Sequence, residues 1–129
     1  GGKRVAFLTD TGYVSEEVEG TIEDADAYMM EFNYDTMMLR DGPYSWPLKQ
    51  RILSDVGHLS NDQAAQALVD VVTSKTKHIF LAHRSQHNNT EYLAHETAKE
   101  MLIEGDADLS DDAKIIDTEP AKPTKLIQI

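Results

Sequence analysis

Two polar residues that could ligate a metal ion follow apolar runs of the sequence. Asp10 comes shortly after the run 5–8, and His83 comes directly after the run 78–82. Carboxylate and imidazole groups ligate divalent metals, and rigid strands hold such ligands precisely. Two ligands are too few for a catalytic metal, however, and the chain contains no H-x-H-x-D-H run. Each residue is also consistent with a structural role, Asp10 as a turn or helix-cap aspartate and His83 as a hydrogen-bonded histidine.

A histidine and a glutamate form a second candidate pair. His58 precedes an expected helix N-cap, where it could act as an acid or a base, or be an ordinary loop residue. Glu31, at the end of an expected strand, could orient His58 by accepting its ring N–H, or be an ordinary strand-end acid. Candidate substrate contacts follow the run 78–82. They are Ser85, Asn88 and Asn89, and the alternative for the two asparagines is to cap the next helix.

Strand and helix patterns alternate along the chain, which predicts an α/β layer architecture. Short apolar runs next to turn residues predict the strands, and capping residues before amphipathic segments predict the helices. Trp46, next to Pro47, is expected to be a packing anchor. The expected strands cover 3–9, 26–32, 77–82, 114–117 and 126–129, and the expected helices cover a short segment after Ser15 and the ranges 47–54, 63–72 and 90–104.

Composition excludes several functional classes. The 129 residues are enough for one domain with a hydrophobic core, and 40% hydrophobic with 27% charged residues is typical of a globular protein. The absence of cysteine excludes disulfides and a cysteine nucleophile, and it fits a reducing cytoplasm. A net charge of −11 argues against a broad basic surface for nucleic acid. No apolar stretch approaches the roughly 20 residues that span a bilayer, so no membrane partner is expected.

Four motifs occur in an order that resembles the metallo-β-lactamase-fold hydrolases, and most closely their YycJ/WalJ branch. The resemblance covers about residues 3–104, which is most of the chain. It implies that residues 1–129 are the C-terminal half of an αββα sandwich, and that the missing N-terminal half carries the H-x-H-x-D-H ligands. The motifs lie at 9–14, at 31–35 with 38–39, at 51–61, and at 81–85 with 88–89.

The same resemblance implies a role for each candidate residue. Asp10 would bridge two divalent metal ions, zinc or manganese, and His83 would be the last histidine ligand. His58 and Glu31 would form a catalytic pair beside the metals, with His58 donating a proton to the leaving oxygen or steadying the phosphate. The implied chemistry is two-metal hydrolysis of a phosphodiester, in this branch by a 5′-to-3′ DNA exonuclease. Without its N-terminal half, the chain alone is expected to be inactive.

Two other interpretations of the sequence stay open. The first is a metallohydrolase of a small phosphodiester or (thio)ester. The negative net charge favours such a small substrate over long DNA. The second is a metal-free interaction domain. For the nuclease and for both of these alternatives, the oligomeric state is open. The chain also departs from the family pattern twice, because Tyr34 stands where a histidine is expected and Arg84 stands where an apolar residue is expected. Both positions could alter substrate contacts.

Overall fold

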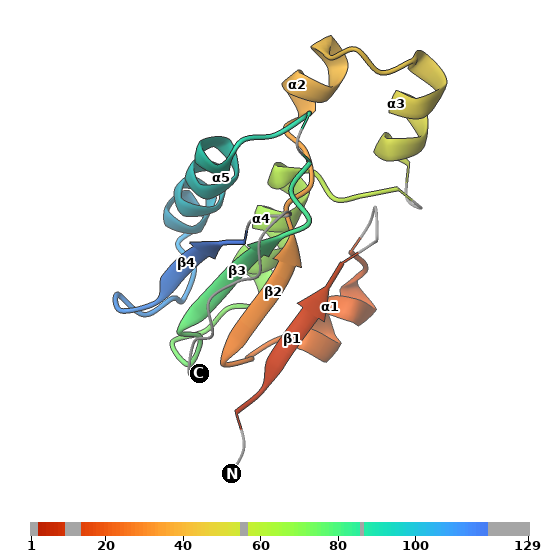
Figure 1. The fold of residues 1–129 in the computed structure, drawn as a ribbon. Coiled ribbons are helices and arrows are strands. Elements are labelled where there is room, and N and C mark those ends of the chain that lie inside the picture. Colours follow the sequence, from red (N-terminus) through yellow and green to blue (C-terminus); the bar gives the residue numbers. More distant parts are fainter. Residues whose placement is uncertain (1–2, 10–13, 55–56, 86, 119–129) are drawn as a thin grey trace.

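The protein is described from a computed structural model that covers residues 3–9, 14–54, 57–85 and 87–118. Four strands form one parallel sheet in the order β1-β2-β3-β4, and five helices connect them (Figure 1). The predicted α/β architecture is therefore confirmed, whereas the expected strand at 126–129 lies outside the described residues. The strands are β1 (Val5–Leu8), β2 (Ala27–Glu31), β3 (His78–Ala82) and β4 (Lys114–Asp117), and the helices are α1 (Glu16–Ile22), α2 (Thr36–Asp41), α3 (Trp46–Leu53), α4 (Asn61–Val71) and α5 (Glu91–Glu104).

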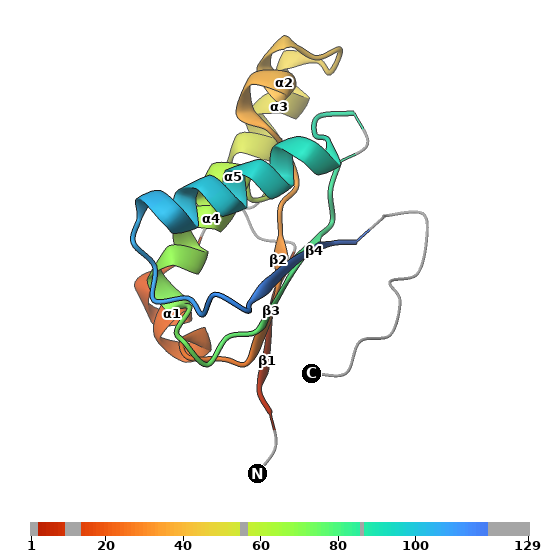
Figure 2. The same ribbon diagram turned by 90° about the vertical axis from the view of Figure 1, so that its left-hand side faces the viewer.

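The helices α1, α4 and α5 all lie on one face of the sheet (Figure 2). Each strand pairs with the one before it, so every crossover moves along the sheet in the same direction. Crossover connections between parallel strands are almost always right-handed. When all of them also run in the same direction along the sheet, their helices lie on the same face. The order of the strands therefore leaves the second face without helices in the described part of the chain.

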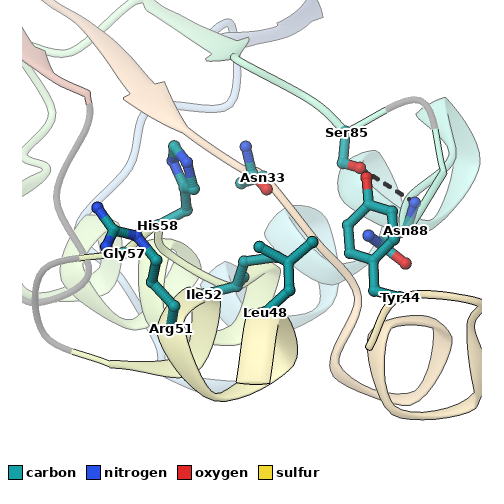
Figure 3. Close-up of a pocket in the computed structure, with 9 residues that line it drawn as sticks. All are labelled: Asn33, Tyr44, Leu48, Arg51, Ile52, Gly57, His58, Ser85 and Asn88. Atoms are coloured by element: carbon teal, nitrogen blue, oxygen red, sulfur yellow. Dashed lines mark hydrogen bonds between the residues drawn. The ribbon is translucent and has the colours of Figure 1, made fainter. Parts of the chain in front are cut away.

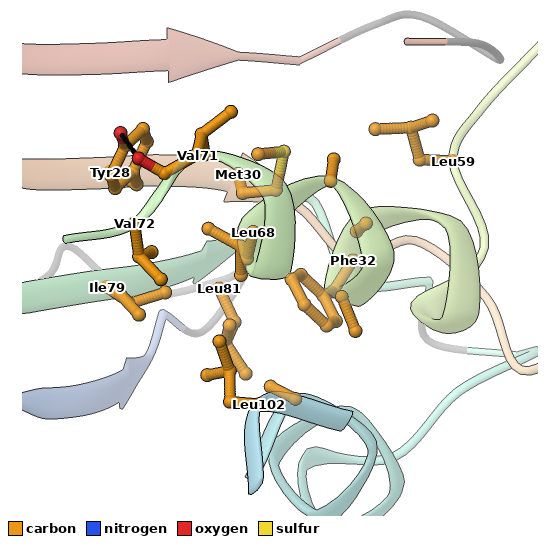
Figure 4. Close-up of a cluster of buried hydrophobic side chains, with 14 of the residues drawn as sticks. Tyr28, Met30, Phe32, Leu59, Leu68, Val71, Val72, Ile79, Leu81 and Leu102 are labelled. Carbon is orange, nitrogen blue, oxygen red and sulfur yellow. Dashed lines mark hydrogen bonds between the residues drawn. The ribbon is translucent and has the colours of Figure 1, made fainter. Parts of the chain in front are cut away.

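Helix α4 shows how local sequence and burial act together in this layer. Ser60 accepts a hydrogen bond from the backbone of Gln63, and the Gln63 side chain accepts one from the backbone of Ser60. This capping box makes the helix begin at 61 rather than at the expected 63. The buried face of α4 packs on the sheet and on α5 (Figure 4). The core residues on this face are Ala64, Ala65, Leu68 and Val71.

The second face of the sheet carries a row of large apolar residues in register. Phe7 pairs with Met29, Met29 with Phe80, and Phe80 with Ile116. None of the four belongs to the core cluster under the helices, and Phe7 is 65% exposed. Side chains alternate between faces along a strand, so this row points away from the helix layer.

Helices α2 and α3 form an arm, residues 36–53, that extends past the carboxyl ends of the strands (Figure 1). The sequence predicted α3 but not α2. Lys49, only 8% exposed, joins the two helices by donating from Nζ to the carbonyl oxygen of Arg40 at 2.7 Å. Trp46 is 61% exposed, so the expectation that it anchors the packing is wrong. Its place at the first turn of α3, followed by Pro47, turns the indole toward solvent.

Among the helices that the structure describes, none has both the length and the apolar character that crossing a membrane requires.

Replacing Glu19 by glutamine is expected to stabilise the protein above neutral pH. Burial raises the pKa of Glu19 from 4.5 to about 7, and a hydrogen bond and repulsion from Asp70 add to this. The folded state therefore binds this proton more tightly than the unfolded state. The stabilisation is complete below pH 4.5 and is lost as the pH rises through about 7.

At pH 8, Glu19→Gln should raise the free energy of unfolding by about 1 kcal/mol or less, because Glu19 is only partly buried and Asp70 is exposed, so that solvent screens the pair. It should also flatten the change in stability between pH 5 and pH 8. Urea unfolding at both pH values measures the effect, and Glu17→Gln, an exposed acid on the same helix, is the control. Equal responses of the two variants would show that the folded protein does not raise the pKa of Glu19.

Candidate functional site

The candidate residues lie at the carboxyl edge of the parallel sheet. Glu31 is the last residue of β2, His83 directly follows β3, and Asp117 ends β4. In a parallel sheet all strands end at the same edge, which is where α/β proteins gather their sites. Asp10 lies outside the described residues, so its expected role as a metal ligand stays a prediction.

Glu31 is the centre of the site. Its side chain is completely buried, yet it meets two histidines, the side chains of which are 39% and 47% exposed. Nδ1 of His58 lies 3.2 Å from Oε2, and Nδ1 of His83 lies 3.1 Å from Oε1. The backbone N–H of Leu59 also donates to Oε2 at 3.0 Å. The expected contact between Glu31 and His58 is present, and the contact with His83 is one that the sequence did not predict.

Glu31 sets which nitrogen of each ring carries the proton. A carboxylate can only accept hydrogen bonds, so both histidines donate to it from Nδ1. In the neutral ring, Nε2 is then the acceptor nitrogen on the opposite side of each imidazole. Nε2 is therefore the atom through which His83 could ligate a metal, and through which His58 could exchange a proton with a substrate.

His58 follows Gly57, which packs against the end of α3. A Cβ on Gly57 would lie 2.4 Å from the carbonyl oxygens of both Arg51 and Ile52, so the chain can pack against the end of α3 here only with glycine. On the other side, Tyr34 forms a parallel bridge with Ser60, the cap of α4. His58 is held between these two contacts.

His83 stands in a turn with unusual backbone geometry. Its φ is 53°, the left-handed region that non-glycine residues rarely adopt. Asn33 holds this turn from both sides, because its Nδ2 donates to the carbonyl oxygen of His83 at 2.7 Å and its carbonyl oxygen accepts from the backbone of Ser85 at 2.8 Å. Strain of this kind persists where surrounding contacts over-determine it, and it is often found at functional sites.

The residues fit part of a metal centre. A histidine whose Nδ1 donates to a carboxylate is the usual arrangement of a metal-ligating histidine, and His83 with Glu31 has it. Over the described ranges, no cluster of three or more histidine, aspartate or glutamate side chains is placed to hold a metal ion. A complete site would therefore need Asp10 and further ligands in addition to His83.

A cavity of about 470 Å³ opens beside His58, between the arm and the loop after β3 (Figure 3). Ser85 and Asn88 line it, as expected for substrate contacts, and their role stays a prediction. The remaining described residues that line it are Asn33, Tyr44, Leu48, Arg51, Ile52 and Gly57. The sequence singled out none of these as a site residue, because they come from segments that only the tertiary structure brings together.

Asn89 has a different position from Asn88. Its side chain is 4% exposed and exchanges hydrogen bonds with the amide of Asn61, Nδ2 to Oδ1, at 2.8 and 2.9 Å. Nδ2 of Asn89 also donates to the carbonyl oxygen of Phe32. These contacts tie the loop after β3 to α4 and to the end of β2. Helix α5 is capped by Thr90, whose hydroxyl accepts from the backbone of Leu93.

The two departures from the family pattern have structural explanations. Tyr34 is 2% exposed, and burial raises the pKa of its hydroxyl. Arg84 forms a bidentate ion pair with Asp117, Nε to Oδ1 at 3.1 Å and Nη2 to Oδ2 at 3.0 Å. Neither Tyr34 nor Arg84 is among the described residues that line the cavity. Any influence on substrate contacts is therefore indirect.

Comparison with known proteins identifies the family of this site. Residues 1–83 match the model of the β-lactamase superfamily domain. The chain belongs to the β-lactamase superfamily. The matched residues include strands β1 to β3 and end at His83, so they contain Glu31 and His58.

Two relatives within the superfamily confirm the expected branch. The chain is 46% identical over 127 residues to "Exodeoxyribonuclease WalJ" of Streptococcus pneumoniae, an alignment of 98% of this chain and 47% of that protein. It is 47% identical over 124 residues to "Exodeoxyribonuclease YycJ" of Bacillus anthracis, covering 96% of this chain and 47% of that protein. The chain therefore spans about half the length of these curated relatives.

Proposed function

We propose that this chain is the C-terminal half of a metal-dependent exodeoxyribonuclease of the β-lactamase superfamily. The observation that carries the proposal is the buried carboxylate of Glu31, which meets Nδ1 of both His58 and His83. One acid thereby orients a candidate proton-transfer residue and a candidate metal ligand at once. The names of relatives that are 46% and 47% identical support a DNA substrate.

In this proposal each residue has a separate task. Asp10 and His83 hold two divalent ions, zinc or manganese, together with ligands from the N-terminal half. When bound, such ions act as Lewis acids on a phosphodiester. His58, oriented by Glu31, exchanges a proton with the leaving oxygen through Nε2. Ser85 and Asn88 contact the substrate, and Asn89 holds the loop that carries them.

The N-terminal half would cover the second face of the sheet. The apolar row Phe7, Met29, Phe80 and Ile116 lies on the face against which a second β layer would pack in an αββα sandwich. Phe80 is only 6% exposed, so Phe7 is the residue of this row that such a layer would newly bury. A large exposed residue such as Phe7 in a row of this kind is typical of an interface. We therefore infer that the active enzyme needs both halves, and that this chain alone is inactive and resides with its other half in the cytoplasm.

Elemental analysis with a cleavage assay tests the proposal. The protein is compared with and without the N-terminal half, on 5′-labelled DNA. We expect about two zinc or manganese ions per molecule and cleavage only when both halves are present. Metal-independent cleavage, or two halves that bind no metal, would contradict the proposal.

His58→Ala and His83→Asn separate the two histidine roles. His58→Ala should lower turnover by about 10²- to 10⁴-fold, the usual contribution of a positioned acid or base, with metal content unchanged. His83→Asn should lower the metal content, while the fold survives because asparagine tolerates the left-handed backbone. His78→Ala, at the opposite end of β3, is the control. Loss of metal from His58→Ala would make His58 a ligand instead.

A further inference from the structure

The described lining of the cavity beside His58 is free of carboxylates, although the chain as a whole is strongly acidic. The protein carries 23 acidic and 12 basic residues, yet no carboxylate occurs among the described residues that line the cavity. Arg51 and His58 do line it, and Arg51 has no carboxylate partner in the described part of the chain. An unpaired guanidinium is well suited to bind a phosphate, because it presents several donors to its oxygens.

The opposite end of the same cavity is suited to a nucleobase. Figure 3 shows Arg51 and His58 on one side, Tyr44 on the other, and Leu48 and Ile52 between them. The Tyr44 ring makes an edge contact with His87, with centroids 6.1 Å apart. Aromatic rings of this kind provide stacking surfaces for bases of single strands.

The wall near Tyr44 also holds an unsatisfied polar group. Asn88 is 2% exposed, and its Oδ1 has no hydrogen-bond partner among the described residues. This oxygen packs against Gly42, 3.0 Å from where a Cβ on that glycine would lie, so it lies behind the wall of the cavity. The volume of about 470 Å³ is far larger than one phosphate and lies in the usual range for small-ligand sites. A DNA duplex does not fit into a cavity of this size.

We propose that the cavity binds the terminal nucleotide of a single DNA strand, with its phosphate at Arg51 and its base against Tyr44. This proposal rests on the proposed nuclease function and identifies the substrate form: a single-stranded end, held by the arm of residues 36–53. Leu48 and Ile52 form the apolar floor under the sugar and base. The phosphate end lies beside His58, so the arm delivers the strand to the proposed proton-transfer residue.

Equilibrium binding of a fluorescein-labelled, 5′-phosphorylated oligothymidylate tests the proposal. Fluorescence anisotropy is measured on the full-length natural protein that contains this chain, with EDTA present so that no cleavage occurs. Tyr44→Ala should weaken binding by about 10-fold or more, whereas Tyr44→Phe, which keeps the ring, should bind like the parent protein. Arg51→Ala should lower the slope of log K against log salt by about 0.7, the value for one lost contact to a single-strand phosphate.

Two control variants match these substitutions. Tyr92→Ala removes a 72% exposed tyrosine from α5, and Arg40→Ala removes an exposed arginine from the same arm without touching the cavity. Neither should alter binding. If Tyr44→Ala and Arg51→Ala bind the oligonucleotide like these controls, the proposed subsite is wrong. If thymidine 5′-monophosphate competes at the same concentration as the oligonucleotide, the cavity is a site for free nucleotides and the assignment to a strand end is wrong.

The binding measurement also separates this inference from the proposed function. A protein that binds the oligonucleotide through Tyr44 and Arg51, but does not cleave it when metals are supplied, supports the subsite and contradicts the nuclease. A protein that cleaves DNA with unchanged binding in both variants supports the nuclease and contradicts the subsite.

Discussion

In the two-half enzyme proposed above, replacing Glu31 by glutamine should lower turnover by about 10- to 100-fold, the usual effect of removing a carboxylate that orients a histidine of a metal site. The side chain keeps its size, but one acceptor oxygen becomes an NH₂ donor. Either the backbone N–H of Leu59 or the Nδ1–H of His83 then faces another donor. The free energy of unfolding should fall by about 1 to 3 kcal/mol, because a buried donor loses its partner.

Cleavage kinetics and urea unfolding measure the two effects of Glu31→Gln separately. Glu100→Gln, an exposed glutamate on α5, is the matched control and should change neither. His58→Ala should cost less stability than Glu31→Gln, because His58 is partly exposed and Glu31 is buried. If Glu31→Gln has the same free energy of unfolding and the same turnover as Glu100→Gln, Glu31 is not the residue that orients the histidines.

Replacing Arg84 by methionine should destabilise the protein by about 3 kcal/mol or more, because it leaves the charge of Asp117 without its partner in a poorly solvated place. The side chain of Asp117 is only 6% exposed and that of Arg84 is 14% exposed, so neither charge is fully hydrated. Both hydrogen bonds of the bidentate pair are lost together. Denaturant unfolding measures the loss.

A double substitution shows whether this loss comes from the unpaired charge. Arg84→Met combined with Asp117→Leu removes both charges and should recover most of the stability, because apolar residues often replace a buried pair without cost. Lys77→Met is the control, since it breaks an exposed ion pair with Asp112 that solvent screens, and it should have little effect on stability. Equal losses from Arg84→Met and Lys77→Met would show that solvent screens the Arg84–Asp117 pair.

The explanation of Arg84 required the tertiary structure. The family resemblance predicts an apolar residue at this position, and nothing near Arg84 in the sequence indicates a partner. Asp117 lies 33 residues away and ends the neighbouring strand, β4. Only the pairing of β3 with β4 brings the two side chains together. The arginine at position 84, which departs from the family pattern, is therefore explained by its ion pair with Asp117.

The cavity likewise depends on contacts that the sequence did not reveal. Tyr44 and Arg51 lie on the arm, and Asn88 follows β3, so the cavity exists only where these segments meet. The arm includes α2, a six-residue helix that is capped by Asp35 and that the sequence did not predict. A helix this short has little periodicity, and its stability comes from tertiary contacts.

The sequence by itself determined the elements and the chemistry available at their ends. Periodicity and the polar residues before the apolar segments predicted the strands and main helices, because these signals act between residues close in the chain. The tertiary structure decided which polar ends meet. Glu31 lies 27 residues from His58 and 52 from His83, and such contacts depend on strand order, register and loop packing. These are set by burial of the whole core, which no local stretch of sequence encodes.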